Sequence, residues 1–264
     1  MKFFTMIFVV LCGSLSGEII EISNFEEIVN HITVDSIILC DIDDTILIPT
    51  QMLGSDEWFC ALMKKHVEEG LSYQEALKES LDKWVMIRHV TKMQLVESST
   101  ASIIQDMQER GFSLMGLTTQ GLTLMEKTTR HLEENGVFFE KEAPFSKDVY
   151  FEQPKRGEFE GVLYRKGVLF TGGAHKGKSF FTLCEKMGYI PKHIVFINDK
   201  ATHLKEIEES AEERGIEFIG LRYAYSDAIK AKFSMEVAEA QFAHVPYRNI
   251  LSDEEAIDRL GLVK

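Results

Sequence analysis

The run Ser36-Ile37-Ile38-Leu39-Cys40-Asp41-Ile42-Asp43-Asp44-Thr45 changes abruptly from apolar to acidic. Its first five residues are almost wholly apolar, as is typical of a strand that is buried on both faces of a parallel sheet. The acidic residues begin where this strand is expected to end. In open α/β sheets, functional side chains gather at the carboxyl ends of the strands. The run therefore predicts a site at one edge of a parallel sheet.

Two more apolar runs are followed by polar residues in the same way. Residues 112–117 precede Thr118, and residues 193–197 precede Asn198 and Asp199. Segments with helical patterning lie between these runs. Alternating strands and helices predict an α/β fold with a Rossmann-like parallel sheet. Asp41, Thr118 and Asp199 are then expected at the same edge of that sheet.

Two segments interrupt the alternation. Residues 47–98 carry helical patterns, which predict a helical insertion after the first of these strands. Residues 137–171 contain short strand-like runs and the turn Arg165-Lys166-Gly167, which predict a small β insertion. We expect a single α/β domain over residues 17–264 that contains both insertions.

The N-terminus has the pattern of a secretory signal peptide. Met1-Lys2 is followed by an apolar run over residues 3–12, and small residues precede Gly17. We expect residues 1–16 to be cleaved and the chain to be secreted or periplasmic; the alternative is a buried first strand or helix. No other stretch approaches about 20 apolar residues, so no stable membrane span is expected after signal removal.

Composition limits the classes of partner. The 264 residues are 45% hydrophobic and 27% charged, as in a globular protein, and the formal net charge is -13. This acidic excess argues against nucleic acid or an anionic membrane surface as a partner. Four cysteines are too few for a disulfide scaffold.

Four motifs occur in an order that resembles the haloacid dehalogenase-like (HAD) superfamily. They are Asp41-Ile42-Asp43-Asp44-Thr45 after a strand, Thr118 at a strand end, Lys176 opening a helix, and Asn198-Asp199 after another strand. Together they cover residues 36 to about 221. The resemblance implies the HAD fold, with residues 47–98 as a helical cap. It also implies a phosphatase, of a secreted acid-phosphatase-like branch or an uncharacterised one.

The resemblance assigns a catalytic role to each of four side chains. Asp41 is the nucleophile, which passes through an aspartyl-phosphate. Asp43 protonates the leaving oxygen and then deprotonates water. Thr118 donates to a phosphoryl oxygen, and Lys176 neutralises the phosphate and Asp41. An Asp at position 43 favours a phosphatase or phosphotransferase over a dehalogenase.

Magnesium is the implied cofactor. Mg²⁺ prefers oxygen ligands and few protein carboxylates, so Asp41, Asp199 and the backbone carbonyl of Asp43 are the expected ligands. The expected substrate is a small phosphomonoester. The resemblance implies that the cap selects it, and the sequence does not distinguish nucleotide from sugar phosphates.

Two other functions stay open at the level of sequence. Many HAD relatives have two acidic residues in the fourth motif, whereas this chain has Asn198 first. A secreted HAD-like binding module without catalysis is therefore one alternative, although Glu206 or Glu208 offers a substitute outer carboxylate. The other alternative is a P-loop NTPase, because residues 172–179 match the Walker A pattern. Only about 90 residues follow Gly172, too few for the usual nucleotide-binding sheet.

Overall fold

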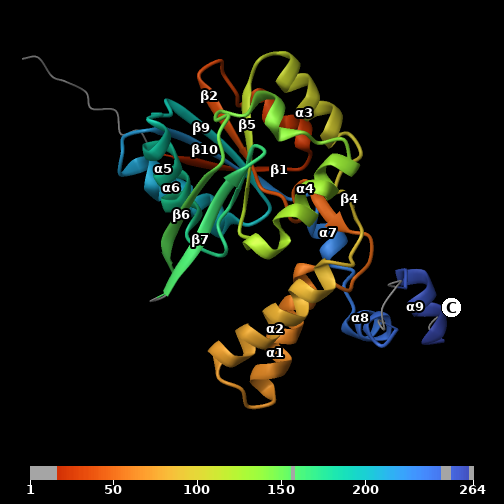
Figure 1. Ribbon diagram of the computed structural model, residues 1–264. Helices are drawn as coiled ribbons and strands as arrows, with labels where there is room; N and C mark the ends of the chain where they lie inside the picture. Colours follow the sequence, from red (N-terminus) through yellow and green to blue (C-terminus); the bar gives the residue numbers. More distant parts are fainter. Residues whose placement is uncertain (1–16, 156–157, 245–250, 262–264) are drawn as a thin grey trace, which may run out of the picture.

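The computed structural model describes residues 17–155, 158–244 and 251–261 (Figure 1). The predicted signal peptide, residues 1–16, lies outside these residues. Eight strands form one sheet, in the spatial order β1-β10-β9-β2-β5-β8-β7-β6. Their bounds are β1 Glu18–Ile22, β2 Ser36–Cys40, β5 Ser113–Thr118, β6 Val149–Lys155, β7 Glu158–Arg165, β8 Val168–Phe170, β9 His193–Asn198 and β10 Glu217–Tyr223.

The sheet is mostly parallel. Every neighbouring pair from β1 across to β8 runs parallel. The pairs β8–β7 and β7–β6 at one edge run antiparallel. The predicted α/β class with a Rossmann-like parallel sheet is therefore confirmed. The edge strand β1, which pairs with β10, has no counterpart in the sequence prediction.

Helices cover both faces of the sheet, because β2 alternates its side chains between two apolar clusters. Ile38 and Cys40 join the cluster on one face, and Ile37 and Leu39 join the cluster on the other. The first face is covered by η1 (Phe25–Asn30), α3 (Thr100–Glu109) and α4 (Met125–Glu134), and the second by α5 (Lys176–Met187) and α6 (Ala201–Glu212). Figure 1 shows these two layers on either side of the strands. Burial on both faces explains the unbroken apolar runs of the sequence.

A pair of antiparallel helices projects from the sheet body, and we call it the helical hairpin (Figure 1). It consists of α1 (Asp56–Glu68) and α2 (Tyr73–Arg88). Ser55 caps α1 by accepting from the Trp58 amide, and Ser72 caps α2 by accepting from the Glu75 amide. Trp58, Leu62, Trp84 and Ile87 form part of an apolar cluster that packs the two helices together.

A short ribbon connects the hairpin to the sheet body. Strands β3 (Leu47–Pro49) and β4 (Met93–Leu95) pair antiparallel, so both ends of the hairpin segment leave the body side by side. The C-terminal helices α7 (Asp227–Lys230), α8 (Met235–Phe242) and α9 (Asp253–Arg259) follow β10. Within this group, Phe242 of α8 contacts Trp58 of α1, with ring centroids 6.0 Å apart.

The segment 137–171 extends the main sheet through β6, β7 and β8. Its β7–β8 turn follows the predicted Arg165-Lys166-Gly167, with left-handed φ values of 49° at Lys166 and 74° at Gly167. Residues 137–139, the first of the strand-like runs in this segment, do not form a strand. A short 3-10 helix, η3 (Phe139–Glu142), is found there instead, because Val137 and Phe139 pack into the core rather than against a strand. Among the described residues, no helix is both long and apolar enough to cross a membrane.

Candidate active site

Asp41 and Lys176 meet in the interior of the protein. Asp41 follows β2 at the carboxyl edge of the sheet, where its amide still donates to the Ile197 carbonyl of β9 at 3.0 Å. Lys176 opens α5 and is fully buried. Its Nζ donates to Oδ1 of Asp41 at 2.6 Å and to the Leu117 carbonyl at 3.0 Å. A buried lysine is stable only when it is paired and hydrogen-bonded, and this arrangement meets both conditions.

Asp43 lies two residues further along and is held from two directions. Arg88, at the end of α2, forms an ion pair with its Oδ1. Gln120, after β5, donates to its Oδ2 at 2.7 Å. The Arg88 contact comes from the helical hairpin and the Gln120 contact from the sheet body. Asp43 therefore bridges the two parts of the molecule.

The loop after β5 is fixed by Thr118. Its hydroxyl oxygen accepts from the Gln120 amide at 3.1 Å, and its proton remains available for donation. Thr128 of α4 donates in turn to the side-chain oxygen of Gln120. This chain of hydrogen bonds orients the side-chain amide of Gln120 toward Asp43.

Asp199 follows β9 and is nearly fully buried. Its amide donates to the Thr45 hydroxyl at 3.0 Å, which ties the β2 and β9 ends together. Lys230 of α7 donates to its Oδ2 at 2.7 Å. Its Oδ1 is buried and has no hydrogen-bond partner among the described residues. Beside it, the Asn198 side-chain oxygen accepts from the Lys200 amide at 2.7 Å, so Asn198 shapes the turn into α6.

Each of four carboxylates around the site faces a cation of the chain. The pairs are Asp41–Lys176, Asp43–Arg88, Asp56–Lys200 and Asp199–Lys230. Lysine and arginine side chains therefore balance the negative charge of these carboxylates. Two of the pairs, those of Arg88 and Lys200, also join the sheet body to the helical hairpin.

Burial perturbs the titration of several groups here. Burial raises the pKa of Asp41 to about 7; Lys176 opposes this shift, and Asp199 adds to it. Burial, followed by the negative charge of Asp56, raises the pKa of Asp44 well above its usual range. Burial, with Lys176 and Lys200 next, lowers the pKa of His203 to about 2, so this imidazole is neutral at physiological pH.

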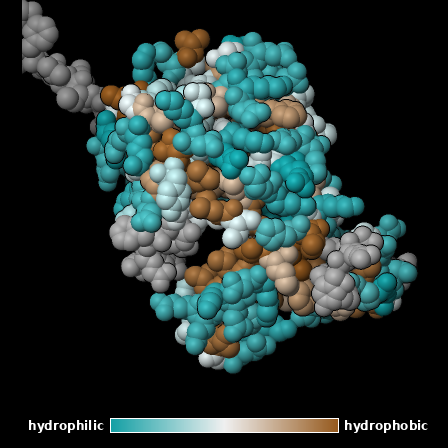
Figure 2. Space-filling model, viewed as in Figure 1, coloured by the Kyte–Doolittle hydropathy of each residue, from teal (hydrophilic) through white to brown (hydrophobic). Residues whose placement is uncertain are grey.

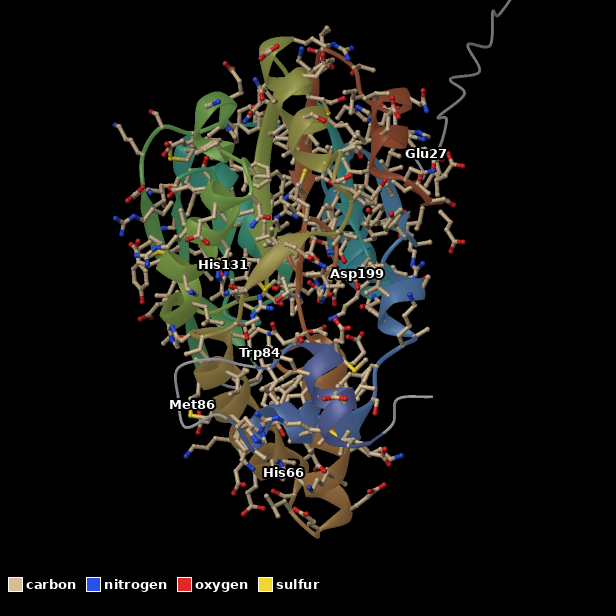
Figure 3. The ribbon with its side chains drawn as sticks, turned by 90° about the vertical axis from the view of Figure 1, so that its right-hand side faces the viewer. Glu27, His66, Trp84, Met86, His131 and Asp199 are labelled. Carbon is tan, nitrogen blue, oxygen red and sulfur yellow. The ribbon has the colours of Figure 1, made fainter. Side chains whose placement is uncertain are left out.

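A cavity of about 570 Å³ opens onto Asp41 and Asp43. Its polar end also includes Thr119, Gln120 and Lys200. Its remaining wall comes from the helical hairpin and from η2 (Leu122–Leu124), and it is largely apolar. Lys176, Thr118 and Asp199 are buried next to this polar end rather than exposed in it. In Figure 3, Asp199 lies on the edge of the sheet body that faces the hairpin.

The segment 172–179, which matches the Walker A pattern, leads from β8 into α5. Lys178 is exposed on α5, whereas Lys176 reaches Asp41. A Cβ on Gly177 would lie 2.0 Å from the Glu206 carbonyl oxygen, so this glycine lets α5 and α6 pack closely. Glu206 accepts from the Lys176 amide at 2.6 Å and so caps α5. It is thus occupied at the helix end and is not placed as an outer carboxylate beside Asp199.

The residues at the sheet edge suit a magnesium ion in their chemistry. The described residues hold no cluster of three or more His, Cys, Asp or Glu side chains arranged for a metal. Mg²⁺, however, is usually bound through one or two carboxylates together with water and substrate oxygens. Asp41 and Asp199 offer two carboxylates, and the unpartnered Oδ1 of Asp199 is a buried acceptor that lacks a donor. A cation would satisfy this oxygen.

The family of the chain is shown by a match over residues 21–257 to the model described as "Protein of unknown function (DUF2608)". The chain belongs to this family. A relative from Chlamydia pneumoniae, named "Putative outer membrane protein", is 24% identical over 96% of this chain and 94% of its own length.

Two solved structures show a remote likeness to the chain. A "Putative haloacid dehalogenase-like hydrolase" from Bacteroides fragilis is 9% identical, with a TM-score of 0.42 over 72% of this chain and 97% of that chain. The class C acid phosphatase from Bacillus anthracis is 12% identical, with a TM-score of 0.33 over 90% of this chain and 83% of that chain. Likenesses this remote do not assign an activity to this chain.

Sequence reasoning missed the partners of the acidic residues. Arg88, Lys200 and Lys230 lie on or beside helices, where a lone basic residue resembles any solvated one. Gln120 had a weak signal, because it lies two residues after Thr118 at a strand end. No pattern in the sequence indicates that Arg88 faces Asp43, since 45 residues separate them.

Proposed function

We propose that this protein is a magnesium-dependent phosphatase that hydrolyses a small phosphomonoester. The observation that carries the proposal is the pairing of buried Asp41 with Lys176 at a cavity that also exposes Asp43. A carboxylate, a neighbouring acid or base, and a fixed cation are the groups that stepwise phosphoryl transfer needs. The order of these residues in the HAD-like motifs supports the same function.

The proposed first step is attack of an Asp41 carboxylate oxygen on phosphorus. The bond between phosphorus and the ester oxygen breaks, and this oxygen takes a proton from Asp43 and leaves as the alcohol. Lys176 and Thr118 stabilise the negative charge of the transferring group. The product of this step is an aspartyl-phosphate on Asp41.

The second step releases phosphate. Asp43 takes a proton from water as the water oxygen attacks phosphorus, and the bond to Asp41 breaks. Arg88 and Gln120 both donate to Asp43 and so hold its carboxyl group in place for this transfer. One alcohol and one inorganic phosphate are formed for each ester and water consumed.

Asp41, Asp199 and the backbone carbonyl of Asp43 are the residues that would hold Mg²⁺. When bound, the ion supplies charge neutralisation to the phosphoryl oxygens. Lys230 donates to Oδ2 of Asp199, whereas Oδ1 has no hydrogen-bond partner among the described residues. The orphaned oxygen of Asp199 supports this assignment.

The test is phosphate release from an aryl phosphate by the full chain. We expect turnover with Mg²⁺, little with a chelator, and none for the Asp41→Asn variant. Wild-type turnover no greater than that of Asp41→Asn, from pH 5 to 9 and with Mg²⁺ or Mn²⁺, would overturn the proposal. That result would favour a binding module without catalysis.

We also propose that the chain is exported and that residues 47–98 act as a cap over the site. The signal-like residues 1–16 and the name of the Chlamydia pneumoniae relative support export. The paired stem of β3 and β4 and the apolar wall that the hairpin gives the cavity support the role as a cap. N-terminal sequencing of the exported protein should begin at Gly17, and an intact Met1 would contradict cleavage.

A further inference from the structure

The helical hairpin turns an apolar face toward the cavity. Tyr73, Leu77 and Leu81 are spaced by four residues along α2, so they line one side of that helix, and all three border the cavity. Trp84 continues this side toward the sheet. The opposite wall includes Leu122 and Leu124 of η2. We call this set of cavity-lining side chains the apolar wall; it also includes Phe59 and Val85.

This wall is not fully used in packing the protein itself. Leu81 is 39% exposed, although it borders a cavity beside a core cluster. Figure 2 shows apolar residues along the hollow between the sheet body and the hairpin. Large apolar side chains that remain accessible inside a concave site commonly mark a ligand surface.

The polar groups of the cavity are concentrated at its other end. Asp41 and Asp43 lie there, and Lys200 is already paired with Asp56. On the hairpin side of the cavity, the polar side-chain atoms beyond this ion pair are the Cys60 thiol, the Tyr73 hydroxyl and the Trp84 indole nitrogen, which already donates to the Ser55 carbonyl. A sugar or a nucleotide base would place many hydroxyl or amide groups against hydrocarbon. Polar groups that lose water without gaining partners bind weakly.

We infer that the alcohol part of the substrate is apolar, such that the enzyme hydrolyses phosphomonoesters of phenols or of long-chain alcohols. This inference rests on the proposed function. The phosphoryl group reaches Asp41, and the hydrocarbon lies against the apolar wall. The cavity volume of about 570 Å³ leaves room for a hydrocarbon beyond the phosphoryl group. Water and the ester are consumed, and the apolar alcohol and inorganic phosphate are released.

The experiment compares four esters with the full chain and Mg²⁺. Naphthyl phosphate and decyl phosphate represent the aromatic and the aliphatic source of the hydrocarbon, and glycerol phosphate and glucose 6-phosphate are the polar controls. We expect kcat/KM at least tenfold higher for one or both apolar esters than for either polar ester. The better apolar ester distinguishes a phenolic from a long-chain substrate.

Two variants test whether the apolar wall binds the hydrocarbon of the ester. Leu81→Asn and Leu77→Asn should raise KM for the better apolar ester about tenfold and change kcat little. Met86→Asn is the matched control, because Met86 is exposed on the same helix but does not line the cavity; Figure 3 labels it with Trp84. Since Leu81 is itself exposed, its replacement should leave thermal unfolding unchanged.

The outcomes separate this inference from the proposed function. Equal kcat/KM for polar and apolar esters, or an unchanged KM in both leucine variants, would overturn the apolar substrate while leaving the phosphatase intact. Absence of turnover with all four esters would overturn both.

Discussion

The carboxyl edge of the sheet and the helical hairpin border the same cavity, but they differ in chemistry. The sheet edge carries Asp41, Asp43 and Asp199, each paired with a lysine or arginine. The hairpin presents aromatic and aliphatic side chains, several of them accessible. Charges held in fixed pairs suit a reaction, because they need not reorganise as charge develops. Accessible hydrocarbon suits recognition of an apolar group. The sheet edge is therefore suited to the reaction and the hairpin to selection of the substrate.

The largest effect should come from the sheet edge. Lys176→Met removes the cation that lies 2.6 Å from Asp41, and we expect kcat to fall about 10²- to 10³-fold. Lys178→Met is the matched control, because Lys178 is exposed two residues further along α5. Steady-state phosphate release measures both variants. Loss of turnover in Lys178→Met with normal turnover in Lys176→Met would instead support the P-loop alternative.

The position of Lys176 depends on close contact between α5 and α6. In Gly177→Ala the new Cβ would collide with the Glu206 carbonyl oxygen, which is backbone and cannot rotate away. We expect the free energy of unfolding to fall by about 2–3 kcal/mol, although alanine favours an isolated helix. Denaturant unfolding measures this change.

Gly121→Ala is the control for this substitution, because a Cβ there meets nothing within 4 Å and φ is -83°. Its stability should change by less than about 0.5 kcal/mol. A Gly177→Ala variant as stable as the wild type would show that the two helices separate without cost.

The stability of the protein should fall in acid because of one buried histidine. His131 is buried on α4, the helix whose Thr128 holds Gln120. Burial, with Lys127 and Arg88 next, lowers the pKa of His131 to about 4, from 6.5 when unfolded. Below pH 6.5 the unfolded chain binds this proton and the folded chain does not, so stability is lost as pH falls from 6.5 toward 4.

The size of this loss follows from comparing the pH dependence of unfolding in the wild type and in a variant without His131. Between pH 8 and pH 5 the His131 contribution should lower the free energy of unfolding by about 2 kcal/mol. His131→Gln should remove this part of the pH dependence, and His244→Gln, at an exposed site, should not. Identical pH profiles for wild type and His131→Gln would contradict the buried neutral imidazole.

The smallest effect is expected where the two regions meet. Arg88→Met removes the hairpin's contact to Asp43 and leaves Gln120 to orient this carboxylate alone. We expect kcat to fall about tenfold with little change in KM, a loss of about 1.4 kcal/mol in transition-state stabilisation. Arg110→Met is the control, because Arg110 pairs with Asp106 at the surface of α3. An unchanged kcat in Arg88→Met would mean that the hairpin does not position Asp43.

The sheet edge was more predictable from sequence than the hairpin's role. Strands buried on both faces leave continuous apolar runs, and β2, β5 and β9 lie within one residue of the predicted runs. A polar residue at the end of such a run is visible without knowing the fold. The bounds Tyr73–Arg88 of α2 also follow from the capping serine and the helical pattern.

Contacts between segments far apart in sequence were not predictable. The β1 strand pairs with β10 across about 200 residues, and its five residues alone do not indicate which strand it joins. The Arg88–Asp43 pair depends on the angle at which the hairpin returns to the body, which no local pattern specifies. The spacing of Tyr73, Leu77 and Leu81 was visible, but a helical stripe indicates burial without showing which surface it faces.

Identification of the phosphorylated residue tests the nucleophile most directly. The full chain is mixed with an aryl phosphate and Mg²⁺, quenched within milliseconds in acid, and reduced with borohydride, which converts an aspartyl-phosphate to homoserine. Peptide mass spectrometry should find homoserine at position 41 in the wild type and none in Asp41→Asn. Turnover of the ester with no modification at Asp41, or with phosphate retained on Thr118, would contradict Asp41 as the nucleophile.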